Sequence, residues 1–265
     1  MIPVTIITGA SAGIGTELAR VFAHHGHVLL LIARREERLK TLAGEITASG
    51  RPPPIVLALD LAQPGAVARI RDTLAANGLE PQYIVNNAGF GLIGSAASLD
   101  RAEQSNMIDL NIRALTELSL AFVESLARQR GGVLNVASVA GFLPGPGMAV
   151  YYASKAYVLS FSEALHRELK SRGVRVTCLC PGPVHTEFAA RAGVIEHEPP
   201  SLLAQSAAHV AEAGYRGLMR GRRVVVPGAA NKIVAFLPRI LPKRLLLAIL
   251  AARQKRRMPS PAPRA

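Results

Sequence analysis

The chain alternates short apolar runs with longer amphipathic segments along most of its length. The runs have the length of buried strands, and the segments between them carry apolar residues at helical spacing. Strand and helix repeated in this order predict a parallel sheet with helices on both of its faces. The predicted strands are Val4–Thr8, Val28–Ile32, Ile55–Leu59, Tyr83–Val85, Val133–Val136, Val174–Leu179 and Val224–Val226.

The same pattern predicts long helices between the strands. Asp100, followed by Glu103, offers a helix cap and its reciprocal partner, so a long helix is expected to begin there. The fold class is therefore α/β, a doubly wound parallel sheet of about seven strands. The predicted helices include Gly13–Ala23, Glu36–Ala48, Arg101–Arg128 and Val150–Lys170.

Composition favours one folded domain followed by a distinct C-terminal segment. The 265 residues are 49% hydrophobic and include no Trp, and no stretch rich in Pro, Gly and Ser interrupts the body of the chain. One large domain over residues 1–230 is therefore expected. Residues 231–265 form a basic, partly apolar extension with a Pro-rich end.

The net charge of +13 is confined to the last fifth of the chain. Thirteen of the 31 Lys and Arg residues lie from Arg216 onward, where no Asp or Glu occurs. The preceding residues therefore balance, with 18 basic and 18 acidic side chains. A nucleic-acid partner is not expected, because the tail lacks the interleaved aromatic residues of a base-stacking surface.

The segment Ile233–Leu250 is apolar enough to raise the question of a membrane span. It is interrupted by Pro238, Arg239, Pro242, Lys243 and Arg244, which excludes a span. Peripheral contact with an anionic membrane surface is one interpretation of this basic tail. The alternative is a helix that packs on the substrate domain or on a subunit partner and ends in a disordered Pro-rich tail.

The two cysteines indicate a reduced protein. Cys178 and Cys180 lie two residues apart in an apolar run, where they are expected in the core, and their spacing is not that of a metal site. No secretory signal opens the chain. A cytoplasmic protein without a bound metal is therefore expected, with peripheral membrane contact left open for the tail.

A glycine-rich turn joins the first predicted strand to the first predicted helix. Gly9, Ser11, Ile14 and Gly15 lie in a Gly-x-x-x-Gly-x-Gly pattern. Such glycines allow a tight turn and bring amide N–H groups against a pyrophosphate at the positive end of the helix. Glycines in this position can also be purely structural, so the other motifs must decide.

Two arginines follow the second strand, where many NAD-binding chains carry an acid for the ribose hydroxyls. Arg34 and Arg35 can clasp a 2′-phosphate with charge-assisted hydrogen bonds, so NADP(H) is expected in preference to NAD(H). The alternative is that they begin a solvated helix with Glu36, which fits Arg35 better than Arg34. After the third strand, Asp60 and Leu61 are candidates for the adenine, and a plain turn or helix cap is the alternative for Asp60.

Four polar residues form the candidate catalytic group. Tyr151 and Lys155 are four apart at the start of a predicted helix and share one face. A phenol titrates at about 10, and a nearby ammonium is expected to lower the pKa of Tyr151 toward the range of efficient acid–base catalysis. Ser138, at the end of the fifth strand, can hold a substrate oxygen beside the phenol. Asn111 lies inside a long helix, where an amide is otherwise a poor choice, and can hold a water next to Lys155.

These motifs resemble the short-chain dehydrogenase/reductase family over residues 4–228, and in particular its NADP-preferring carbonyl and ketone reductases. The resemblance implies a single Rossmann-type domain, an NADPH-dependent reduction of a ketone or aldehyde to an alcohol, and a homo-oligomer, either a dimer or a tetramer. The matching stretches, in the family's order, are Thr8–Gly15, Asn86–Gly89, Asn111, Ser138, Tyr151–Lys155 and Pro181–Thr186.

The resemblance also implies a role for each matching residue. Tyr151 would donate the proton, Lys155 would bind the nicotinamide ribose, Ser138 would orient the carbonyl, and Asn111 would hold the water of a proton relay. The residues expected to bind the cofactor are Gly9, Ser11, Ile14, Gly15, Arg34, Asp60, Leu61, Asn87, Ala88, Gly89, Tyr151, Lys155, Val184 and Thr186.

Residues 187–205 resemble the family's variable lid over the substrate. Apolar residues also follow several strand ends, which predicts a pocket suited to a carbonyl compound with a hydrophobic body. These residues are Phe90, Leu92, Phe142 and Leu143.

The alternative function is that of a non-catalytic sensor or scaffold. Such a protein would bind NADP(H) and associate with a membrane surface through its basic tail. Ser138, Tyr151 and Lys155 argue against it, because a scaffold has no use for a proton donor.

Overall fold

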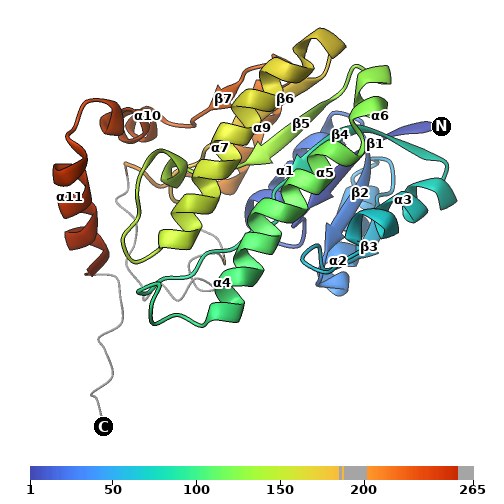
Figure 1. Ribbon diagram of the computed structural model, residues 1–265. Coiled ribbons are helices and arrows are strands. Elements are labelled where there is room, and N and C mark those ends of the chain that lie inside the picture. Colours follow the sequence, from blue (N-terminus) through green and yellow to red (C-terminus); the bar gives the residue numbers. More distant parts are fainter. Residues whose placement is uncertain (185–186, 188–201, 256–265) are drawn as a thin grey trace.

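A seven-stranded sheet runs through the centre of the molecule, with helices on both of its faces (Figure 1). The computed structural model describes residues 1–184, 187 and 202–255. The strands are parallel, in the order β3-β2-β1-β4-β5-β6-β7, which confirms the predicted doubly wound α/β fold of Rossmann type. They are β1 (Ile2–Thr8), β2 (Val28–Ala33), β3 (Ile55–Ala58), β4 (Leu79–Asn86), β5 (Gly132–Val136), β6 (Arg175–Leu179) and β7 (Val224–Val225).

Most of the predicted helices form close to their expected bounds. The helix α2 (Glu36–Ala48) matches the prediction, and the helices predicted over Gly13–Ala23 and Val150–Lys170 differ from it by one residue at one or both ends. Short 3₁₀ turns η2 (Val139–Phe142), η3 (Lys170–Arg172) and η4 (Leu237–Arg239) connect longer elements. The other helices are α1 (Gly13–His24), α3 (Ala66–Ala76), α7 (Ala149–Leu169), α9 (Ala207–Met219), α10 (Ala229–Phe236) and α11 (Lys243–Lys255).

The long helix expected over Arg101–Arg128 is divided into four parts. It begins as predicted, with Asp100 Oδ1 accepting a hydrogen bond of 2.8 Å from the backbone N–H of Glu103. After α4 (Arg101–Ile108) the backbone forms a π-helical turn, η1 (Asp109–Ala114), before α5 (Leu115–Ala121) and α6 (Val123–Arg128). Single π-helical turns inside α-helices are frequent at functional sites.

Apolar side chains cover both faces of the sheet. On one face Phe22 of α1, Leu39 of α2 and Leu218 of α9 belong to one buried cluster, and on the other Ile70 of α3 and Leu165 of α7 belong to a second. Parallel strands buried in this way read as continuous apolar runs. This explains why the strands could be recognised in the sequence.

His27, just before β2, is enclosed by aromatic rings. Its ring lies 5.1 Å from that of Phe22 and 5.3 Å from that of Tyr83, between ring centroids. Hydrogen bonds join it to Thr5 Oγ1 at 3.2 Å and to the Tyr215 hydroxyl at 3.4 Å. Burial, reinforced by the neighbouring His25, lowers the pKa of His27 to about 4.

We predict that the free energy of unfolding falls as the pH drops from about 6.5 to about 4, because the unfolded chain then binds a proton that folded His27 does not. Because the ring is partly exposed, screening limits the loss to about 1–2 kcal/mol. Urea denaturation of the protein and of His27→Gln across this pH range measures the effect. The variant should show a flatter pH dependence, and an unchanged slope would refute the assignment.

Candidate active site

The candidate residues converge on the edge of the sheet where the strands end. The glycine-rich turn follows β1, Asn87–Gly89 follow β4, Ser138 follows β5, and Pro181–Val184 follow β6. Loops diverge at this edge of a doubly wound sheet, so it is where ligands bind. The N-terminal part of α7 brings Tyr151 and Lys155 to the same edge.

Lys155 is a buried cation in the middle of this group. Its side chain belongs to a residue that is only 6% exposed. Its Nζ donates a hydrogen bond of 2.9 Å to the carbonyl of Val136, at the end of β5, and lies 5.8 Å from the centroid of the Tyr151 ring. Burial disfavours the charged amine and lowers the pKa of Lys155 to about 8, against an opposing effect of the thiols of Cys178 and Cys180.

Tyr151 is also affected by burial, but in the direction opposite to the one predicted. Burial raises the pKa of Tyr151 above its usual value, and a hydrogen bond with Ser138 only partly opposes this effect. The predicted lowering by Lys155 is therefore wrong for this structure. The reason is that the phenolate is removed from water, while the Lys155 ammonium is directed at the carbonyl of Val136. The phenol is consequently protonated at neutral pH.

Ser138 is held in place at the end of β5 by its own local hydrogen bonds. Its Oγ accepts a bond of 3.1 Å from the backbone N–H of Ala140, capping η2, and donates one of 3.4 Å to the carbonyl of Pro181. These contacts fix the hydroxyl between the loops that follow β5 and β6. A hydroxyl and a phenol thus meet at one point of the site, as predicted.

Asn111 lies in the π-helical turn and is almost fully buried. Its amide accepts a hydrogen bond of 3.1 Å from the backbone N–H of Phe90 and donates to the Phe90 carbonyl at 2.9 Å and to Ser154 Oγ at 3.0 Å. The side chain therefore fastens the loop after β4 to α7. Its role in a proton relay stays a prediction.

Gly89 lies against this anchor and against the buried cation. A Cβ atom at position 89 would stand 2.9 Å from Asn111 Oδ1 and 3.6 Å from Lys155 Nζ. The first distance is too short for a side chain, so only glycine lets the loop approach so closely. This explains the glycine in the predicted cofactor-binding stretch.

The glycine-rich turn has the backbone that a phosphate loop requires. Gly9 has a φ of +65°, and a Cβ at Gly15 would stand 2.2 Å from the carbonyl oxygen of Gly9. Asn87 Nδ2 donates to the carbonyls of Thr8 and Gly9 at 3.0 and 3.2 Å. Within the described residues α1 has no side-chain cap, so its first N–H groups suit an anion such as a pyrophosphate.

The two arginines after β2 have different neighbours. Arg34 lies 3.8 Å from Asp60 Oδ2, whereas Asp60 Oδ1 accepts a turn hydrogen bond of 3.0 Å from the N–H of Ala62. Arg35 contacts the glycine-rich turn, with its Nε and NH2 each 3.4 Å from Ser11 Oγ. The interpretation of Arg35 as only the solvated start of a helix is therefore incomplete.

The remaining candidates are placed in part. Leu61 is buried, and Ile14 packs on the core. Val184 forms an isolated parallel bridge with Gln205. Thr186 lies outside the described residues, as does most of the expected lid at 187–205.

Asn231, in α10, was not recognised as a candidate. It is 1% exposed, and its Nδ2 donates to the carbonyls of Leu203 and Pro227, each at 3.2 Å. A Cβ at Gly182 would stand 2.2 Å from Asn231 Oδ1. Asn231 therefore packs directly on the loop after β6.

Comparison with known proteins places this chain in a family. The sequence profile of the short chain dehydrogenase family matches residues 3–194. The chain is 40% identical over 191 residues to sulfoacetaldehyde reductase 2 of Chromohalobacter salexigens. The aligned region covers 71% of this chain and 75% of that protein.

Two solved structures are similar over nearly the full length. A short-chain dehydrogenase from Sphingobium yanoikuyae in complex with NADPH has a TM-score of 0.78 and 30% identity, covering 99% of both chains. A bulky-bulky ketone specific alcohol dehydrogenase from Comamonas testosteroni has a TM-score of 0.75 and 28% identity, covering 100% of this chain and 97% of that one. The chain belongs to the short chain dehydrogenase family, which confirms the resemblance seen in the sequence.

We predict that Asn111→Ala lowers the free energy of unfolding by about 2–4 kcal/mol, because it removes three buried hydrogen bonds. Asn77→Ala is the matched control, since the Asn77 side chain is exposed and makes a solvent-exposed hydrogen bond to the carbonyl of Thr73, so its loss should cost less than about 1 kcal/mol. Urea denaturation compares the two. Equal losses would show that Asn111 is not an anchor.

Proposed function

We propose that the protein is an NADPH-dependent reductase that converts a ketone or aldehyde into an alcohol, with Tyr151 as the proton donor. The observation that carries this proposal is the meeting of a protonated phenol, the Ser138 hydroxyl and the buried amine of Lys155 at one edge of the sheet. When bound, NADPH supplies the hydride that adds to the carbonyl carbon.

The protonation state of Tyr151 suits the reductive direction. Hydride addition leaves an alkoxide, which is a far stronger base than a phenolate, so a phenol with a raised pKa still donates its proton to it. Ser138 donates a hydrogen bond to the carbonyl oxygen and orients it toward the phenol. Lys155 binds the nicotinamide ribose, and Asn111 holds the loop beside it.

The choice of NADP(H) rests on the charges after β2. Arg34 and Arg35 lie at the same edge as the glycine-rich turn, and Arg35 contacts Ser11 in that turn. Guanidinium groups bind a phosphate dianion with paired, charge-assisted hydrogen bonds. The similar dehydrogenase from Sphingobium yanoikuyae, solved with NADPH, supports this choice.

A hydrophobic body is the proposed character of the substrate. Phe90 is buried and Leu92, Phe142 and Leu143 are half-buried after the ends of β4 and β5. Apolar walls with a few placed polar groups are typical of sites for small organic ligands. The ketone-specific alcohol dehydrogenase from Comamonas testosteroni has a similar structure, which supports this class of substrate.

A homo-oligomer, either dimer or tetramer, is the proposed assembly. Ile108, Leu120 and Tyr157 are exposed on α4, α5 and α7. Exposed apolar residues grouped on neighbouring helices are a common sign of an interface. Tyr157 is also ordered by a hydrogen bond of 2.9 Å with Thr116 and a stacked contact with Phe161.

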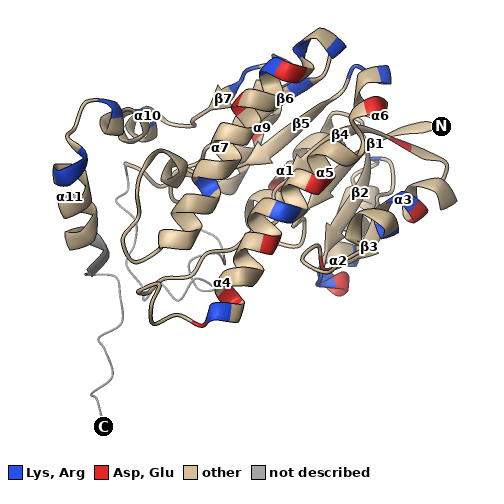
Figure 2. Cartoon of the chain, in the orientation of Figure 1, with Lys and Arg blue, Asp and Glu red and all other residues tan. Residues whose placement is uncertain are grey.

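The C-terminal helices are proposed to lie on an anionic membrane surface. Ile233, Phe236 and Ile240 are exposed, the first of them by 64%, and Figure 2 shows basic positions but no acidic ones along the described part of α10 and α11. Apolar residues interspersed with Lys and Arg match a negatively charged lipid surface. Among the described residues, no helix has the length and apolar composition needed to span a membrane.

We predict that Tyr151→Phe lowers kcat/KM by about 10²–10⁴-fold while the affinity for NADPH is retained. Tyr152→Phe, which removes a hydroxyl one residue away, should keep most activity. The assay follows the absorbance of NADPH against a panel of ketones and aldehydes. High activity of Tyr151→Phe would contradict the mechanism, and a wild type inactive on the whole panel would favour a non-catalytic binding module.

We also predict that the full chain sediments with phosphatidylserine-containing vesicles but not with pure phosphatidylcholine vesicles. The double variant Ile233→Asp/Ile240→Asp should abolish sedimentation, because a charged side chain is costly at the boundary between lipid headgroups and acyl chains. Leu202→Asp, at an exposed site outside these helices, is the control. Binding to neither kind of vesicle, with self-association through these helices, would identify a second copy as the partner instead.

A further inference from the structure

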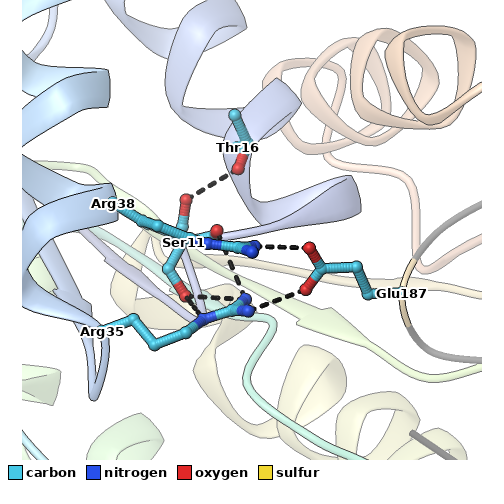
Figure 3. A network of polar contacts seen from close by, with 6 residues as sticks. Ser11, Thr16, Arg35, Arg38 and Glu187 are labelled. Carbon is cyan, nitrogen blue, oxygen red and sulfur yellow. Dashed lines mark hydrogen bonds and ion pairs between the residues drawn. The ribbon is translucent and has the colours of Figure 1, made fainter. Parts of the chain in front are cut away.

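The two guanidinium groups near the glycine-rich turn hold a carboxylate from a distant part of the chain. Figure 3 shows the Glu187 carboxylate facing the guanidinium groups of Arg35 and Arg38, with Ser11 on the other side of the Arg35 guanidinium. Arg35 NH1 donates to Glu187 Oε2 at 2.8 Å, and Arg38 NH1 donates to the other carboxylate oxygen. A residue that follows β6 thus reaches the end of the site that follows β2.

We propose that the Glu187 carboxylate competes with the 2′-phosphate of NADP(H) for Arg35, and thereby limits how strongly the protein prefers NADP(H) over NAD(H). This inference rests on the proposed function, because it assumes that the 2′-phosphate is bound beside Ser11 and the arginines after β2.

The hydrogen bonds of Arg35 show why the two anions exclude each other. Its NH1 is engaged by Glu187 at 2.8 Å, whereas its contacts with Ser11 Oγ and the Ser11 carbonyl are longer, at 3.4 Å. Nε and NH2 of Arg35 face Ser11 and NH1 faces Glu187, so a phosphate bound beside Ser11 competes with the carboxylate for a guanidinium whose donors form one fixed fork.

The negative charge of Glu187 also opposes binding of the 2′-phosphate. Hydrogen bonds from Arg38 and Arg35 lower the pKa of Glu187, so this carboxylate is ionised throughout the neutral range. It therefore opposes a phosphate dianion by repulsion as well as by occupying its donors. Because Glu187 is half-exposed, water and salt weaken the repulsion.

The size of the effect follows from this exposure. Exposed ion pairs contribute little to stability, so displacing Glu187 from Arg35 weakens binding of the 2′-phosphate only by a factor of about two to five. Such a factor shifts the choice between the two cofactors without abolishing binding of either.

The test compares two fragments that differ only in the 2′-phosphate, namely 2′,5′-ADP and 5′-AMP, by calorimetry at low salt. Glu187→Gln keeps the size of the side chain but removes its charge, and we expect its ratio of affinities for 2′,5′-ADP over 5′-AMP to rise about two- to fivefold above wild type.

Glu37→Gln is the matched control, because it makes the same change in net charge two residues from Arg35 at a carboxylate that pairs with Lys40. It should raise the ratio by less than Glu187→Gln does. An unchanged or lower ratio in Glu187→Gln, with wild type still preferring 2′,5′-ADP, would overturn the competition. A wild type that does not distinguish the two fragments would instead overturn the proposed NADP(H) preference on which it rests.

Discussion

The buried ammonium of Lys155 is the constraint around which the site is organised. A cation removed from water is stable only where the protein supplies partners, and here the carbonyl of Val136 lies 2.9 Å away. The ring of Tyr151 lies beside it, and so does Gly89, whose lack of a side chain makes room for Asn111 Oδ1. The end of β5, the start of α7 and the loop after β4 are therefore brought together at one group.

Burial affects the pKa values of Lys155 and Tyr151 more strongly than the charge of the neighbouring side chain does. It lowers the pKa of Lys155 to about 8 and raises that of Tyr151, although the two side chains are neighbours. Each residue is thus pushed toward its neutral form, as expected in surroundings of low polarity. A neutral phenol is the form that donates a proton, as the proposed reduction requires.

The fold could be predicted because its determinants are local in the sequence. Continuous apolar runs mark the buried strands, and Asp100 with Glu103 marks the start of α4. The π-helical turn at Asn111 could not be foreseen, and the residues to which Asn111 is hydrogen-bonded there, Phe90 and Ser154, are distant from it in sequence.

The sequence identified three side chains that the structure brings together, but it did not reveal how they contact their surroundings. Ser138, Tyr151 and Lys155 do meet, yet the direction of the pKa shift of Tyr151 depends on burial, which spacing does not reveal. The ion pair between Arg35 and Glu187 joins residues 152 positions apart, and the packing of Asn231 on Gly182 also depends on the tertiary fold.

The most direct test of this account is the ionisation of Tyr151 itself. Difference absorbance between the wild type and Tyr151→Phe, recorded from pH 7 to 10, isolates the phenolate of this one residue. The account predicts no phenolate signal from Tyr151 over this range, because burial keeps the phenol protonated. A signal that titrates below pH 10 would show that Lys155 outweighs burial, and would contradict the account.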